Sequence, residues 1–215
     1  MADTPLTLVN RALQKIGAGA ITTLDTTIDT SDRAVTMCTL YEPVLRAALQ
    51  DGRWNFTQIR ASLQAWTCNP VHEFNCAYLL PFDLLQVEET TLDEAEAWRV
   101  ESLYCSTTDV YTNIIVTDSC SPLGIVYSAY VTNPRLWKPL FTEALVTELA
   151  YQATFTITAS QSRVDGLARE RERAWSKAKA RDGQEGRPLK RFLSDVLLRA
   201  RFSRSTFRDP RRLSE

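Results

Sequence analysis

The chain has 215 residues, of which 44% are apolar and 24% are charged, and its formal net charge is −1. A chain of this length and composition can bury one sizeable core, which excludes an intrinsically disordered protein. Its longest apolar runs, such as 114–116 and 76–80, fall far short of the roughly 20 residues of a membrane-spanning helix, so we expect no membrane anchor.

The N-terminal region is predicted to be helical. Residues 1–5 have neither the positive flank nor the apolar core of an export signal, so we expect synthesis in the cytoplasm. From Pro5 to Gly17 apolar residues recur every three or four positions, and Gly17 supplies a stop. A second helix should begin at Thr30, Ser31 or Asp32. Its inward residues are predicted to be Val35, Cys38, Tyr41, Val44, Leu45 and Ala48, and Pro43 should kink or break it.

The region after this helix begins with a turn at Asp51-Gly52. The segment from Arg53 to Asn69-Pro70 fits a strand or a helix, and the sequence leaves that choice open. Trp54 and Phe56 are expected in the core rather than at an interface, because a Trp/Phe pair after a helix end usually packs back on the helices.

The centre of the chain is rich in β-forming residues. Short runs, separated by turn-forming residues, occur at 76–80, 84–88, 98–100, 113–117 and 124–131. This spacing predicts an antiparallel sheet or a small sandwich inserted between two helical halves.

Helical periodicity returns after Asn133-Pro134, with Pro134 in the first turn. A last helix is predicted over residues 160–181, with the run 169–173 of alternating charge on a solvated face. Its inward residues should be Val164, Leu167, Ala168, Ala174, Trp175 and Ala178. Residues 182–186 have the composition of a linker.

Candidate chemical groups are few. The five cysteines lack a C-x-x-C pair and form an odd set, so we expect small buried residues rather than a disulfide framework or a zinc site; they are Cys38, Cys68, Cys76, Cys105 and Cys120. The single histidine, His72, should be solvated. The carboxylates are expected to face solvent in a loop at Glu88, Glu89, Asp93 and Glu94. Gly17-Ala18-Gly19 fits a helix end better than a phosphate loop. The sequence therefore predicts no catalytic residue, metal ligand or cofactor, and no enzyme.

Residues 187–215 differ from the rest of the chain in charge. They carry nine Lys/Arg and three Asp/Glu, a net charge of +6. Residues 1–186 carry 16 Lys/Arg and 23 Asp/Glu, a net charge of −7. We expect this basic tail to dock on an acidic partner rather than to be disordered or to bind DNA directly, because its apolar side chains require burial. The predicted docking residues are Phe192, Leu193, Val196, Leu197, Arg199, Arg201, Phe202, Arg204, Phe207 and Arg208.

Several motifs follow one another in a specific order. They are Leu8-Val9-Asn10-x-Ala12-Leu13-x-x-Ile16-Gly17, YEPVLRAALQDGRWNF at 41–56, Tyr78-x-Leu80-Pro81-x-Asp83, and Phe141-x-Glu143-Ala144-Leu145. Together, over residues 6–182, these motifs resemble the tail tubular protein A family of podophages, the head-to-tail adaptors of short-tailed phages.

The resemblance implies an α+β, mainly helical fold. This fold is an antiparallel helix bundle with an inserted small antiparallel β subdomain and a basic C-terminal extension. The bundle halves would be residues 1–75 and 132–182, the β subdomain 76–131, and the linker and portal-docking tail 183–215.

The resemblance also implies a structural virion protein at the head–tail interface, made in the host cytoplasm. Such a protein forms a dodecameric ring between the portal and the tail tube. The implied partners are the portal protein and the tail tube (nozzle) protein, with tail fibres as further candidates. Genomic DNA would pass through the lumen during ejection without specific binding.

Two other functions are considered. The alternative is a nucleic-acid-binding accessory protein that acts through the Arg/Phe-rich tail, with an affinity that falls steeply with salt. A hydrolase is disfavoured because the chain lacks a usable histidine or metal cluster.

Overall fold

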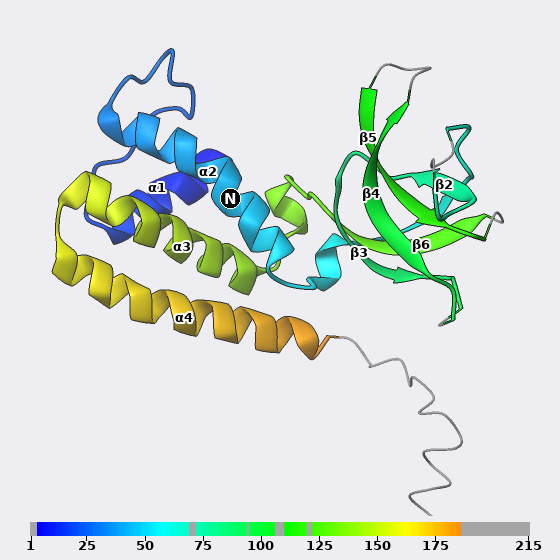
Figure 1. Ribbon diagram of the computed structural model, residues 1–215. Coiled ribbons are helices and arrows are strands. Elements are labelled where there is room, and N and C mark those ends of the chain that lie inside the picture. Colours follow the sequence, from blue (N-terminus) through cyan, green and yellow to red (C-terminus); the bar gives the residue numbers. More distant parts are fainter. Residues whose placement is uncertain (1–3, 69–71, 94, 106–109, 120–121, 186–215) are drawn as a thin grey trace, which may run out of the picture. The chain divides into compact units, whose positions relative to one another are not determined.

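The chain is described here from a computed structural model, which covers residues 4–68, 72–93, 95–105, 110–119 and 122–185. This described part contains four α-helices and six strands in two antiparallel sheets (Figure 1). The fold is therefore α+β, and the strands lie in sequence between the second and third helices.

The first helix, α1, spans Pro5–Lys15, as its periodicity predicted. Thr4 caps it through a reciprocal pair of hydrogen bonds with Thr7, of 3.2 and 2.7 Å. Gly17 follows with φ +72°, a left-handed conformation that glycine adopts without strain. The prediction of a helix end at Gly17-Ala18-Gly19 is confirmed.

Helix α2 spans Asp32–Gln50 and begins after the predicted cap Ser31. Val44, Leu45 and Ala48 are buried as expected, but Val35 is 44% exposed and Met37 is buried in its place. Of the kink or break predicted at Pro43, the break is absent, because the helix continues through it. Pro43 and Thr39, whose carbonyl loses its partner, are both exposed, so water can satisfy that carbonyl.

The segment that the sequence left open forms a short 3₁₀ turn and a strand. The turn is Asn55–Thr57, and β1 runs from Gln58 to Leu63. All six residues of β1 pair in regular antiparallel register with β6.

The remaining strands confirm the five predicted β runs. They are β2 (Cys76–Leu79), β3 (Leu84–Thr90), β4 (Trp98–Cys105), β5 (Val110–Thr117) and β6 (Leu123–Ala129). The strand order is β1-β6-β3 in one sheet and β2-β5-β4 in the other. Tyr78 and Ile115 from the second sheet share a core with Ile125 and Tyr127 from the first. Of the two arrangements that the sequence left open, a single antiparallel sheet or a small sandwich, the two sheets with a shared core favour the second.

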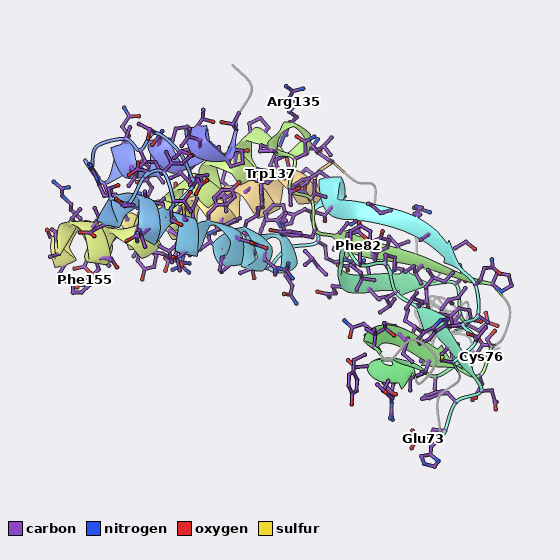
Figure 2. The ribbon with its side chains drawn as sticks, turned by 90° about the horizontal axis from the view of Figure 1, so that it is seen from above. Glu73, Cys76, Phe82, Arg135, Trp137 and Phe155 are labelled. Carbon is purple, nitrogen blue, oxygen red and sulfur yellow. The ribbon has the colours of Figure 1, made fainter. Side chains whose placement is uncertain are left out.

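Helix α3 spans Pro139–Thr158 and packs against α1, α2 and α4 (Figure 1). Pro134 does not start this helix as predicted; it opens a 3₁₀ turn, Pro134–Leu136, and α3 takes Pro139 at its first position. In Figure 2, Trp137 lies close to the start of α3 and Phe155 close to its end. No described helix is long and apolar enough to cross a membrane.

Helix α4 spans Gln161–Gly183, with Leu167 and Ala178 buried and Trp175 partly buried against the helical core. The predicted linker at 182–186 begins too early, because Asp182 lies within the last turn of α4 and is only 7% exposed.

The expectation that the cysteines are small buried residues outside any disulfide framework is wrong for two of them. Cys68 and Cys76 are both disulfide-bonded. Cys38 is free, and its Sγ lies 3.0 Å from the carbonyl oxygen of Leu24. An odd number of cysteines leaves at least one unpaired but does not prevent others from bonding when the fold brings them within the short distance that a disulfide requires.

Candidate interaction surfaces

The predicted docking residues of the tail, 192–208, fall outside the described residues. What the structure does describe is the end of α4, directly before the tail begins. The contacts that hold this helix end, and the exposed surfaces of the two sheets, are therefore the candidate sites.

An aromatic cluster lies beneath the end of α4. Trp54 is 2% exposed, and its Nε1 donates to the carbonyl of Ala48 at 2.9 Å. Its ring centroid lies 5.0 Å from that of Phe141, edge-on, and 6.0 Å from that of Trp175. Phe56 is partly buried and also meets Phe141 edge-on. The expectation that Trp54 and Phe56 belong to the core is confirmed.

Asp182 joins the end of α4 to the chain after α2. Its Oδ2 accepts a 2.9 Å hydrogen bond from the backbone N–H of Asn55, and its carbonyl accepts one of 2.6 Å from Asn55 Nδ2. Burial raises the pKa of Asp182, because the carboxylate loses hydration. Its Oδ1 is buried without a hydrogen-bond partner.

A second contact holds the same end. Lys138 Nζ, just before α3, lies 2.7 Å from Glu185 Oε2. A pocket of about 180 Å³ is lined in part by Trp54, Phe141 and Asp182. The point from which the tail departs is therefore fixed on the helical core.

A network of charges connects α1, α3 and α4. Lys15 Nζ lies 2.8 Å from Glu143 and 2.7 Å from Glu170, and Arg11 lies 2.6 Å from Glu143. The hydrogen bond from Lys15 lowers the pKa of Glu143. Burial alone would lower the pKa of Lys15, but its hydrogen bonds to the two glutamates outweigh burial, and the pKa is raised.

The alternating run on α4 thus pairs with other helices. Glu170 contacts α1, and Arg171 Nε lies 2.9 Å from Glu148 on α3. Both contacts are structural.

Of the two carboxylates at the start of the predicted loop, Glu89 has a side chain that is 40% exposed, but Glu88 does not face solvent as expected. Glu88 lies in β3, and its side chain is only 5% exposed. It forms an ion pair with Arg53 and accepts a 3.0 Å hydrogen bond from Ser128 Oγ. Glu89 lies 3.5 Å from the same arginine. Asp93 is exposed in a loop as predicted, and Glu94 falls outside the described residues.

His72 is exposed, as predicted. Within the described part of the chain, no group of three His, Cys, Asp or Glu side chains could hold a metal ion. The hydrogen bonds and ion pairs described above join different elements and stabilise the fold.

The β segment carries the negative charge of the body. Residues 58–131 contain ten Asp/Glu and two Lys/Arg, or −8, whereas the rest of residues 1–186 sums to +1. The two cations are Arg60 on β1 and Arg99 on β4.

An apolar surface lies along the β4–β5 hairpin. Trp98, Val100 and Tyr104 alternate along β4 and are 37%, 49% and 46% exposed. Tyr111 on β5, opposite Tyr104, is 74% exposed, and the two ring centroids are 5.1 Å apart. Phe82 is fully exposed in the turn between β2 and β3 (Figure 2). The sequence prediction missed this surface, although the alternation of Trp98 and Val100 was a signal for it.

Comparison of the chain with models of known protein families and with curated proteins finds no match.

Proposed function

We propose that the chain is a structural subunit of a head-to-tail adaptor of a short-tailed phage, and that it assembles into a ring between the portal and the tail tube. The proposal rests on the positions, in the fold, of the motifs that resemble the adaptor family. Their apolar residues build the core and its junctions: Leu8, Val9, Ala12 and Leu13 in α1, Trp54 after α2, Tyr78 and Leu80 by β2, and Phe141, Ala144 and Leu145 in α3.

In this proposal the four helices form an antiparallel bundle, and the β subdomain is inserted between its halves. Because β1 pairs with β6, we take the subdomain to include residues 58–131 rather than 76–131. The halves of the bundle then meet at α3, which contacts the other three helices. Residues 183–215 would be the extension that grips the portal.

The charge distribution supports a channel protein. Residues 58–131 carry −8, and like charge repels DNA phosphates and keeps them from adhering to the protein. A basic tail on an acidic subunit suits docking on a second acidic protein.

The environments of the titratable groups also favour a structural role. Glu143, Glu88 and Asp182 each have partners from another element: Lys15, Arg53 and Asn55. Such pairs stabilise a fold, and these three carboxylates are engaged in structural contacts rather than held free as a general acid or base.

The second candidate, a nucleic-acid-binding accessory protein, is favoured by the charge of +6 in residues 187–215. It predicts an affinity for DNA that falls steeply as salt is raised. A ring subunit should show only weak binding of this kind.

The deciding experiment mixes the full-length chain with the portal protein of the same phage and measures the masses of the free and mixed proteins. The free chain should be monomeric or loosely associated, and a stable ring should form only on the portal. Deleting residues 187–215 should abolish stable attachment and leave the thermal transition nearly unchanged. Failure of the full-length chain to associate with its portal, or full attachment by the truncated chain, would contradict the proposal.

A further inference from the structure

Two of the four sheet edges are suited to pairing with another chain. The edges are β1 and β3 in one sheet, and β2 and β4 in the other. The pairing of β3 is interrupted by register shifts, and β2 has only four residues. By contrast, β1 and β4 pair regularly along their whole lengths and present a free row of N–H and C=O groups.

These two strands lack three of the usual protections of an edge, although each carries charged residues: Arg60 on β1, and Arg99 and Glu101 on β4. Natural edge strands are often blunted by proline, lysine or a bulge. The strands β1 and β4 contain no proline or lysine, and they keep regular register with their single partners. An exposed regular edge with apolar side chains is a template for adding a strand.

The apolar face of each strand continues the core of its own sheet. On β4, Val100 is opposite the buried Ile115 and is itself 49% exposed. On β1, Ala61 is opposite the buried Ile125, and Ile59 on the same face is 40% exposed. Another strand laid on either edge would therefore extend an apolar face.

The opposite faces of the two strands carry complementary charges. Glu101 on β4 and Arg60 on β1 are both exposed. Neither side chain has an ion-pair or hydrogen-bond partner within the described part of the chain. Arg60 is moreover one of only two cations in a segment with ten acidic residues.

We propose that β4 of one copy pairs antiparallel with β1 of the next copy, in the register that places Val100 opposite Ala61. This register also places Trp98 opposite Leu63 on the apolar face. On the other face it brings Glu101 opposite Arg60.

Other registers place less compatible side chains opposite each other. A shift by one residue would set charged side chains against the apolar face. A shift by two in one direction places Arg99 opposite Arg60, and in the other direction it separates Glu101 from Arg60. The charges and the apolar face thus select the same register.

The pairing joins two different edges, so it is head-to-tail, and repeated contacts close into a ring when the rotation permits. The inference rests on the proposed ring and identifies its subunit interface. The weak energy of a single strand pair agrees with a free chain that associates loosely and closes only on a template.

The first test is a charge exchange in the full-length chain, with self-association measured by sedimentation velocity over a range of concentrations. Arg60→Glu and Glu101→Arg should each weaken association by about 2- to 30-fold per contact. The double variant, in which the charges are exchanged, should regain most of the loss. Glu172→Arg, the same charge change at an exposed position on α4, should leave association unchanged.

The second test is a covalent trap. Under mild oxidation, a chain with both Ala61→Cys and Val100→Cys should give a ladder of linked oligomers, and either single substitution should not. Lack of a ladder, or a double charge variant that fails to recover, overturns the pairing. Rings that form on the portal equally well with Glu101→Arg overturn it too but leave the adaptor function standing. A variant that combines Arg99→Glu with Glu101→Arg could form dimers where Glu101→Arg alone does not. This result would indicate that β4 pairs with β4 of another copy about a two-fold axis, and it would overturn the head-to-tail arrangement.

Discussion

The ion pair between Arg53 and Glu88 should be strongly asymmetric in its effect on stability. The Glu88 side chain is 5% exposed, whereas that of Arg53 is 55% exposed. Arg53→Met leaves a buried carboxylate with only Ser128 Oγ as a described side-chain donor, at 3.0 Å. Losing one partner of a fully buried pair costs about 3 to 5 kcal/mol. Because water reaches this arginine, we expect a smaller loss of about 2 to 3 kcal/mol, in the range of hydrogen bonds to charged groups.

The matched variant is Glu88→Gln. Glutamine can keep the hydrogen bond from Ser128 and leaves Arg53 free to be hydrated, so the loss should stay below about 1 kcal/mol. In the double variant no buried charge remains, so it should be more stable than Arg53→Met alone. Urea unfolding at neutral pH measures the unfolding free energies of the wild type, the two single variants and the double variant. A double variant whose loss equals the sum of the two single losses would refute the reasoning.

Three further variants test single groups by unfolding experiments. Glu143→Gln should lose about 0.5 to 1 kcal/mol at neutral pH, and the deficit should vanish as pH falls through the lowered pKa of Glu143. Because burial raises the pKa of Asp182, the wild type loses stability as pH rises from the ordinary aspartate range through that pKa, and Asp182→Asn should not. The Tyr41 hydroxyl is buried without a partner, and its pKa is raised to about 12. Tyr41→Phe should therefore gain about 1 kcal/mol of unfolding free energy. The raised pKa of Tyr41 also makes the wild type lose stability as pH rises above the ordinary tyrosine range, and Tyr41→Phe should not show this loss.

Glu172→Gln, at an exposed position on α4, is the control and should change the unfolding free energy by less than about 0.5 kcal/mol. A Glu143→Gln deficit that persists in acid would contradict the assigned pair. If the difference in unfolding free energy between Asp182→Asn and the wild type does not vary with pH, the assignment of a raised pKa to Asp182 is contradicted. A less stable Tyr41→Phe would show that the hydroxyl has a favourable contact.

Elements with strong local periodicity could be predicted from the sequence. The helices α1 and α4 and five of the six strands follow the expected patterns. The strand β1 could not be assigned, because its pairing with β6 joins residues 60 to 70 positions apart and its side chains are mostly exposed. The inward face of α2 was misjudged at Val35, because helices packed against it determine which residues are covered.

The candidate surfaces depend on contacts that no local pattern contains. Glu88 was expected in solvent, but Arg53 from the segment after α2 and Ser128 on β6 provide the partners of its buried carboxylate. Whether β4 is an edge strand follows from the order of the sheet and not from its own residues. The exposed charges Arg60 and Glu101 are informative only once both strands are known to be edges.

The order of elements along the chain also affects how the protein folds during synthesis. Helix α2 ends at Gln50, its packing partner α3 begins at Pro139, and 88 residues lie between them. At translation rates of about 5 to 20 residues per second, this interval lasts about 4 to 18 s. During that time the apolar faces of α1 and α2 have no α3 to cover them, while the intervening strands can already pair. The newly made N-terminal helices are therefore the part of the chain most in need of a chaperone.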